Sequence, residues 1–349
     1  MSKFIKKIKI KKPDDWHVHL RDNKILKKVI KYTGKFYKRA LIMPNLNSPI
    51  TNCIKSIAYR SRILKSMHLN YEFQPLMTCY LTKFTVPQEL EVGFSKKIFI
   101  AAKFYPYSST TNSKKGIKKI SDIASVLECM EKIGMPLLIH GEEINKNIDI
   151  YDREAKFIET TLDPLRNKFP KLKIVLEHIT TKESVEYVKK NDFNYLSATI
   201  TPHHLMLNRN DMFYGGIRPY LYCLPILKKN THQIALREAI SNGDKHFFLG
   251  SDTAPHLNKN KINVLGCAGI FNAPSSLLSY VQIFEEMNAL KHLESFCSEN
   301  GPKFYNMPIN KETVTIIKKP FKIKKKIKVG RDVIIPFLSG ETLNWSIKN

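Results

Sequence analysis

The chain alternates between two kinds of hydrophobic pattern along most of its length. Eight short and almost continuously apolar segments recur at intervals, with longer stretches between them. Segments of this kind are typical of β-strands that are buried on both faces of a sheet. They occupy residues 16–20, 39–43, 73–81, 98–105, 136–141, 173–178, 196–201 and 246–252.

The stretches between these strands carry apolar residues at the spacing of amphipathic helices. The predicted helices span residues 24–32, 53–67, 119–133, 152–167, 182–190, 229–241 and 275–288. Strands that alternate with helices indicate parallel β-α units, and eight such units fit a closed (β/α)8 barrel. The sequence therefore predicts an α/β TIM barrel as a single domain over residues 1–349, with a lysine-rich segment at 318–328 and a C-terminal extension. A doubly wound open sheet is the alternative, although no strand is followed by a glycine-rich phosphate-binding loop.

Polar side chains stand at the carboxyl ends of several predicted strands. His17 and His19 are two positions apart in the first strand, so they share one of its faces. The other candidates belong to the fourth, fifth, sixth and eighth strands: Lys103, His140, His178 and Asp252. Since the carboxyl ends of barrel strands gather at one mouth, we expect these six side chains to converge.

These residue types together indicate a metal site. Imidazole and carboxylate groups suit Zn²⁺, and a catalytic zinc keeps one position open for water. A lysine ammonium has no lone pair for a cation, so Lys103 fits only as a CO₂-derived carbamate that bridges two metals. His17 and His19 would then hold one zinc, and His140 and His178 the other. Two such metals can share a hydroxide of lowered pKa, while Asp252 shuttles a proton.

Each candidate, taken alone, also fits an ordinary structural role. A histidine at a strand end is often a hydrogen-bonded core residue, a strand lysine extends to solvent, and Asp252 could cap a helix. His203 and His204 follow the seventh strand, and we assign them a structural or supporting role. The joint placement of the other six residues favours a site.

The charge balance raises a different possibility. The chain has 57 Lys and Arg against 31 Asp and Glu, a net charge of +26, which is typical of proteins that bind nucleic acids or anionic surfaces. However, the lysines are spread along the chain, dense runs occur only at 6–12 and 318–328, and arginine is scarce. The distribution favours a compositional bias, and we expect no nucleic-acid partner.

The cysteine spacing and the lack of a recognisable targeting signal lead us to expect a cytoplasmic protein. The six cysteines are far apart with no C-x-x-C pair, so neither a disulfide framework nor a thiolate zinc site is indicated. The basic N-terminus lacks the apolar region of a signal peptide, and no apolar run reaches the length of a membrane span. We therefore expect no membrane partner.

An ordered set of motifs resembles one enzyme family. The chain is similar to dihydroorotases of the short bacterial-type class in the amidohydrolase superfamily, from about residue 8 to the C-terminus. The H-x-H motif alone is weak, but the ordered set is specific. The matching segments are "PDDWHVHLRD", "MPNL", "LMTCYLT", "AAKFYP", "EKIGMPLLIHGE", "EHITTK", "ATITPHHLM", "RPYLYCLPILK", "LGSDTAPH", "GCAGIFNAP" and "NGPKFY".

This resemblance implies a binuclear zinc enzyme. It would reversibly cyclise N-carbamoyl-L-aspartate to (S)-dihydroorotate and water, the third step of de novo pyrimidine synthesis, and in the hydrolytic direction a bridging hydroxide would attack the ring amide. Asp252 would be the general acid and base, and the family implies a homodimer. The implied ligands of the two Zn²⁺ ions are His17, His19, Lys103 as N6-carboxylysine, His140, His178 and Asp252.

The resemblance also implies which groups hold the substrate. Arg21, Asn45 and His256 match the family's carboxylate-binding positions, and His19 and His140 would also contact the substrate. Backbone groups of Leu224 and Ala268 would read the ring amide, and Thr110 and Thr111 would belong to a mobile loop within 107–116. The forked guanidinium of Arg21, two residues beyond His19, suits a carboxylate.

Within the same class, a hydantoinase or an allantoinase is the nearest alternative. The lack of an extra sandwich domain, together with "MPNL" and "SDTAPH", favours a dihydroorotase.

Overall fold

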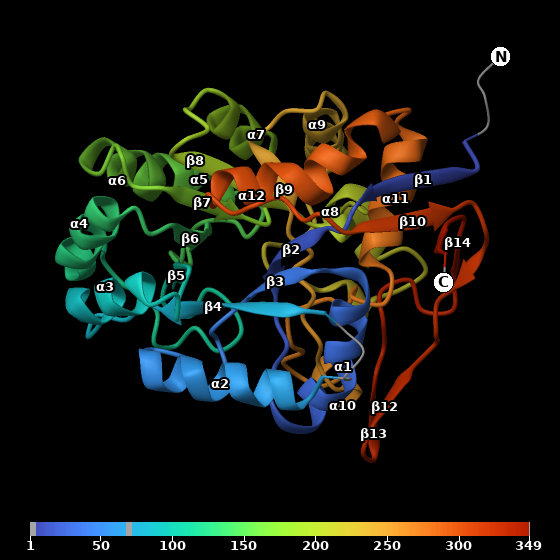
Figure 1. The fold of residues 1–349 in the computed structure, drawn as a ribbon, viewed down its shortest axis with the longest axis horizontal. Helices are drawn as coiled ribbons and strands as arrows, with labels where there is room; N and C mark the ends of the chain where they lie inside the picture. Colours follow the sequence, from blue (N-terminus) through green and yellow to red (C-terminus); the bar gives the residue numbers. More distant parts are fainter. Residues whose placement is uncertain (1–4, 68–71, 349) are drawn as a thin grey trace.

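A computed structural model describes residues 5–67 and 72–348, and a ring of eight parallel strands forms its centre (Figure 1). Each strand pairs with the next strand of the ring along the chain, so the order follows the sequence. This confirms the predicted (β/α)8 architecture. The strands are β2 (Asp14–Val18), β3 (Arg39–Ile42), β4 (Gln74–Tyr80), β5 (Ala101–Phe104), β6 (Leu137–His140), β7 (Ile174–Glu177), β8 (Leu196–Ile200) and β9 (Phe247–Leu249).

The ring closes between β2 and the segment that follows β9. Val18 forms a parallel bridge with Thr253, and the His19 N–H donates to the Thr253 carbonyl at 3.0 Å. The Asp252 N–H donates to the His17 carbonyl at 2.9 Å. Closure therefore brings the first and last candidate ligands together at the same edge.

Helices surround the ring on its outer side (Figure 1). All seven predicted helices are present, although 152–167 consists of two short helices joined by a π-helical turn at Ile158–Leu162. Among the described residues no helix is long and apolar enough to cross a membrane. The helices are α1 (Asn23–Phe36), α2 (Cys53–Lys65), α3 (Pro87–Ser95), α4 (Ala124–Ile133), α5 (Arg153–Phe157), α6 (Asp163–Lys168), α7 (Lys182–Lys189), α8 (Pro202–Met206), α9 (Asn230–Ser241), α10 (Asn258–Lys261), α11 (Ser276–Glu286) and α12 (Asn300–Phe304).

The sequence pattern did not reveal α3. It begins with a proline and contains Gly93, a poor helix former. Tertiary packing explains the glycine, because a Cβ atom there would lie 2.3 Å from the Phe99 ring.

Small antiparallel sheets lie outside the ring and contain both lysine-rich runs. Strand β10 (Thr313–Ile317) pairs with β1 (Lys7–Lys11) on one side and β15 (Ser346–Ile347) on the other. The second run lies around the pairs β11 (Phe321–Lys322) with β14 (Thr342–Leu343), and β12 (Ile327–Val329) with β13 (Asp332–Ile334). Within the runs, Ile10, Ile323 and Ile327 are buried while most of the lysines are exposed, so the lysines form the solvated faces of these sheets.

Apolar side chains fill the end of the barrel opposite the predicted site. Trp16 stacks on Tyr305 with ring centroids 4.2 Å apart and meets Phe248 edge-on. Helix α12 closes this end, because Gly301 lies so close that a Cβ would be 2.0 Å from the Trp16 indole nitrogen. A packed lower half leaves the mouth as the place where polar side chains gather.

Candidate active site

Alternation along the strands aims several polar side chains into the barrel above the apolar layer. Ala101, Leu138 and Val175 belong to the buried cluster around Trp16. Two residues further along each strand, on the same face, are Lys103, His140 and Glu177. In β2 the register shifts between Asp15 and Val18, a β-bulge that accompanies the placement of both Trp16 and His17 inside the barrel.

His17, His19 and Asp252 form one compact group. The Nε2 atoms of the two histidines are 3.1 Å apart, and Asp252 Oδ1 lies 3.3 Å from His17 Nε2 and 3.1 Å from His19 Nε2. All three residues are buried. Three ligand atoms within this distance of one another can converge on a single metal ion.

His140 and His178 extend this group across the mouth. The His178 ring centroid lies 5.0 Å from that of His17 and 4.9 Å from that of His140. His140 Nε2 also lies 2.7 Å from a carboxylate oxygen of Glu142, a residue that the sequence interpretation did not single out. The structure thus brings all four predicted histidines together.

Lys103 lies at the bottom of the group and is fully buried. Its amine nitrogen contacts the Glu177 carboxylate, whose other oxygen lies 2.9 Å from His17 Nδ1. Glu177 is not among the predicted site residues, because the motif at this strand end indicates His178, the next residue. Strand alternation from Val175 would have found it, since Val175 and Glu177 share a face.

Three of the predicted site residues have left-handed backbone conformations. Their φ angles are 57° at Arg21, 45° at His178 and 47° at Asp252. This region is unfavourable for residues other than glycine, and such strain is concentrated at functional sites. At His178 it also breaks the alternation of β7, so that Glu177 and His178 both point inward.

Burial sets the protonation of the cluster. Desolvation lowers the pKa of His17 and His178 well below the ordinary range, and the neighbouring Lys103 and histidines lower it further. The imidazoles of His17 and His178 are therefore neutral and keep a lone pair for a metal. Burial also lowers the pKa of Lys103 well below its usual range, and a neutral amine is the form that reacts with CO₂.

The donor set fits a metal centre. His19 Nδ1 and His178 Nδ1 are buried without a hydrogen-bond partner within the described residues, whereas His17 Nδ1 and Lys103 Nζ both lie against the Glu177 carboxylate. Two groups of closely spaced ligand atoms occur here, one formed by His17, His19 and Asp252 and the other by His17, Glu177 and His178. Buried polar atoms without partners are costly, and a bound metal would compensate for this cost.

A third group of ligand atoms, from His203, His204 and Cys223, is of a different kind. Both ring nitrogens of His204 are used, one with the Thr201 hydroxyl at 2.7 Å and the other with the Pro225 carbonyl at 3.0 Å. These contacts suit the structural role that the sequence interpretation assigned to the two histidines.

A small cavity of about 20 Å³ lies over the histidine cluster. It is lined by nearly all of the predicted ligand and substrate-binding residues: His17, His19, Arg21, Asn45, Thr110, Thr111, His140, His178, Leu224, Asp252 and Ala268. His256 lies behind Arg21 rather than in the lining, with its Nε2 2.9 Å from the guanidinium. Lys103 is also outside the lining, beneath the histidines.

The loop at residues 107–116 closes this cavity. Asn45 Nδ2 donates to the Thr111 carbonyl at 3.0 Å, and the Thr111 hydroxyl donates to the Ala268 carbonyl at 3.3 Å. Asn112 Nδ2 donates to the Asn45 carbonyl at 3.0 Å. Because the remaining space holds no more than a water molecule, a substrate can enter only after the loop has moved.

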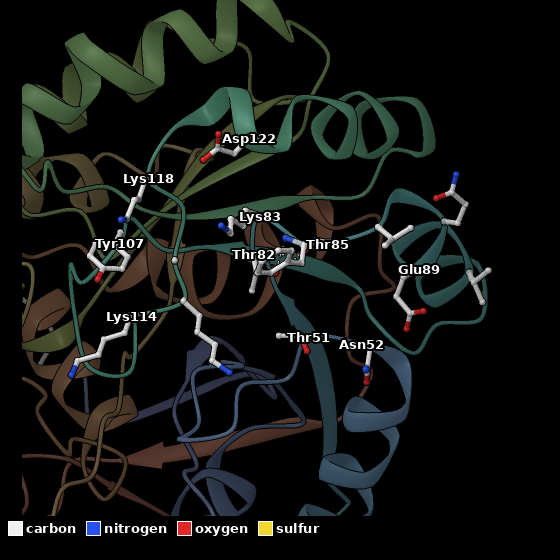
Figure 2. Close-up of a pocket in the computed structure, with 16 residues that line it drawn as sticks. Thr51, Asn52, Thr82, Lys83, Thr85, Glu89, Tyr107, Lys114, Lys118 and Asp122 are labelled. Carbon is white, nitrogen blue, oxygen red and sulfur yellow. Dashed lines mark hydrogen bonds between the residues drawn. The ribbon is translucent and has the colours of Figure 1, made fainter.

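A larger cavity of about 1000 Å³ also borders this loop (Figure 2). Tyr107 and Lys114 line it from the loop, Lys118 from just beyond the loop, and Thr82 and Thr85 from the segment after β4. It contains no histidine, and Glu89 in its wall already accepts the Cys53 N–H at 2.6 Å. The reactive groups are therefore in the smaller cavity.

Comparison with known proteins gives a consistent picture. Residues 10–343 match the model of the amidohydrolase family. The chain is 86% identical over 349 residues to a dihydroorotase of Buchnera aphidicola subsp. Acyrthosiphon pisum (strain Tuc7), covering 100% of both chains. It is 54% identical over 341 residues to a dihydroorotase of Yersinia enterocolitica, covering 98% of both. The crystal structure of a Saccharomyces cerevisiae dihydroorotase in complex with 5-fluoroorotic acid aligns with a TM-score of 0.91 and 32% identity over 99% of both chains.

Proposed function

The chain belongs to the dihydroorotases of the amidohydrolase family, and on that premise we propose that it interconverts N-carbamoyl-L-aspartate and (S)-dihydroorotate with two zinc ions. This reaction would be the third step of pyrimidine nucleotide synthesis. The observation that carries the proposal is the buried convergence of four histidines, Lys103 and Asp252 at the mouth of the barrel.

The proposed metal ligands divide into two sets around Lys103. His17 and His19 would hold one zinc and His140 and His178 the other, while Lys103, as N6-carboxylysine, would bridge them. When bound, the zinc ions supply Lewis-acid chemistry that polarises the carbonyl under attack and lowers the pKa of water. Glu177 would orient His17 from below, at 2.9 Å from its Nδ1.

Asp252 would move the proton. Its carboxylate lines the cavity beside His17 and His19, at the place where the attacking water and the ring nitrogen must meet. In the hydrolytic direction it would accept a proton from the water and deliver it to the departing ring nitrogen, and in cyclisation it would do the reverse.

Arg21 would bind the substrate's free carboxylate. Its guanidinium is held by the Pro255 carbonyl at 3.2 Å and by His256, and within the described residues no carboxylate forms an ion pair with it. Burial lowers the pKa of His256 well below its ordinary value, and the nearby Arg21 lowers it further, so its neutral ring can accept from Arg21. A guanidinium without a counter-ion at a cavity wall suits an anionic ligand, with Asn45 and His256 as further partners.

The ring end of the substrate would lie against backbone groups of Leu224 and Ala268, which line the opposite wall. His19 and His140 would contact the substrate beside the metals. Thr110 and Thr111 would close over it from the loop and exclude water. The yeast relative was solved with 5-fluoroorotic acid, a ligand with a pyrimidine ring and a carboxylate, which supports this arrangement.

Direct assays with three substrates test the proposal. We expect turnover of dihydroorotate and none of hydantoin or allantoin, together with about two zinc ions per chain by metal analysis. Turnover of hydantoin with no activity on dihydroorotate would overturn the substrate assignment.

The bridging role of Lys103 has its own test. Lys103→Ala is expected to lose bound zinc and activity together, whereas Lys132→Ala, an exposed lysine on α4, should retain both. An active Lys103→Ala enzyme without metal would contradict the binuclear mechanism.

The proposed homodimer of 40.4-kDa chains predicts a sedimenting species of twice that mass.

A further inference from the structure

Lys261 is a buried cation whose partners are all backbone carbonyls. It is the last residue of α10 and is 6% exposed. Its ammonium donates to the carbonyls of Tyr222 at 3.0 Å, Cys267 at 2.8 Å and Gly269 at 2.9 Å. These bonds use all three of its N–H donors.

The absence of an acidic partner makes this arrangement unusual. Among the residues that the structure describes, no carboxylate forms an ion pair with Lys261. Burying a charge without a counter-ion is unfavourable unless its hydrogen bonds are fully made. The three carbonyls are therefore held by bonds stronger than those between neutral groups.

These bonds determine which way the peptide groups of residues 267–269 face. The Cys267 N–H donates to the Asn260 carbonyl at 2.9 Å, and the Gly269 N–H donates to the Tyr222 carbonyl at 2.9 Å. Cys267 thus directs both of its backbone polar groups toward α10, while Gly269 directs its carbonyl to Lys261 and its N–H to Tyr222. Ala268, between them, presents its carbonyl to the Thr111 hydroxyl and lines the small cavity.

The carbonyls held by Lys261 form a network that we call the Lys261 clasp, and the Tyr222 carbonyl connects it to a second segment of the chain. It accepts from both Lys261 and Gly269, and it lies two residues before Leu224, which also lines the cavity. We propose that Lys261 is a positioning residue that holds the Ala268 and Leu224 backbones in register for recognition of the substrate's ring amide. This inference rests on the proposed function, since the ring amide belongs to dihydroorotate.

Three variants test the role through steady-state kinetics. Lys261→Met keeps the aliphatic stem and removes the donors, so we expect KM for dihydroorotate to rise about tenfold with kcat changed less than about threefold. Lys261→Arg keeps a cation and should recover part of the loss. Lys259→Met, an exposed lysine on the same helix, is the matched control and should behave as wild type. A wild-type KM in Lys261→Met would overturn the inference.

The pH dependence of KM in the unmodified enzyme gives a second test, which does not require the methionine variant to fold. Burial lowers the pKa of Lys261 to about 8, against the opposing effect of the Cys223 and Cys267 thiols. The Tyr222 phenol and His256 also face this region. Above that pH the neutral amine has two N–H donors for three carbonyls, so KM should rise through about pH 8. The guanidinium of Lys261→Arg stays charged, so its KM should not show this step, and the same rise in both enzymes would contradict the role of Lys261.

Hydrogen exchange separates this inference from the proposed function. In Lys261→Met the backbone amides of the peptide covering 262–270 should exchange faster than in wild type. This expectation holds whether or not the enzyme acts on dihydroorotate. If wild type does not act on dihydroorotate but the exchange still increases, the clasp stands and the proposed function fails. Unchanged exchange together with full activity on dihydroorotate would overturn the clasp alone.

Discussion

Glu177 shows how one residue can matter to the site without being an expected ligand. It contacts both Lys103 and His17 at the base of the histidine cluster. One carboxylate oxygen orients the His17 imidazole, and the other faces the buried amine of Lys103. Carboxylates in this position commonly tune metal affinity through the histidine that they contact.

We expect Glu177→Gln to lower zinc affinity about 10- to 100-fold, because the amide keeps the shape but removes the negative charge. Chelator competition with zinc measures this directly. Glu159→Gln, at an exposed position in the π-helical turn between α5 and α6, is the control. Equal zinc affinities in the two variants would show that Glu177 only fills space.

A second prediction at this scale concerns His204. Burial lowers its pKa to about 4, so the folded protein keeps the ring neutral while the unfolded chain takes up a proton near pH 6.5. Stability from this residue is therefore present above pH 6.5 and is lost as the pH falls toward 4.

By linkage, wild type should lose about 2 kcal/mol more unfolding free energy than His204→Gln between pH 7 and pH 5. Urea denaturation of both proteins at the two pH values measures this difference. The other buried histidines contribute equally to the pH dependence of wild type and variant, so their effect cancels. Parallel pH dependences would mean that the His204 ring does not resist protonation.

At the scale of elements, the loop at 107–116 is a wall shared by two cavities. Its threonines face the small cavity, while Tyr107 and Lys114 border the larger one (Figure 2). The contacts that close it are few, and all of them are made by the tip of the loop. The equilibrium between closed and open forms is therefore sensitive to a single hydrogen bond.

Thr111→Val removes the hydroxyl that donates to Ala268 and preserves the side-chain shape. A hydrogen bond of ordinary strength predicts a fall in kcat/KM of about 2- to 12-fold. Hydrogen exchange across 107–116 should increase in parallel. Thr342→Val, an exposed threonine in β14, serves as control, and unchanged kinetics in Thr111→Val would argue against closure by this contact.

At the scale of the whole molecule, the charge of +26 lies mainly on solvated faces. In the run at 318–328 the isoleucines are buried and most lysines are exposed, which is the pattern of an amphipathic sheet. The fold therefore accounts for these lysines without a role in nucleic-acid binding. Dispersed lysines still attract polyanions at low salt.

We therefore expect weak DNA binding that falls steeply with salt, with a dissociation constant above about 1 µM at physiological ionic strength. Replacing the exposed Lys324, Lys325 and Lys326 together with Gln should weaken this binding and leave dihydroorotate turnover unchanged. Submicromolar binding at physiological salt, measured by fluorescence anisotropy, would instead indicate a nucleic-acid partner.

The sequence alone determined the architecture and the candidate residues. Continuous apolar runs specify buried parallel strands, and polar residues at strand ends are informative because the barrel gathers those ends. Only the tertiary structure decided how the side chains meet. The bulge in β2 and the left-handed backbone at His178 break the simple alternation, and local pattern contains no signal for either. The contacts of Glu177 with Lys103 and His17 span 74 and 160 residues of the chain, and the bond from Lys261 to Tyr222 spans 39 residues. Such contacts exist only once the barrel has closed.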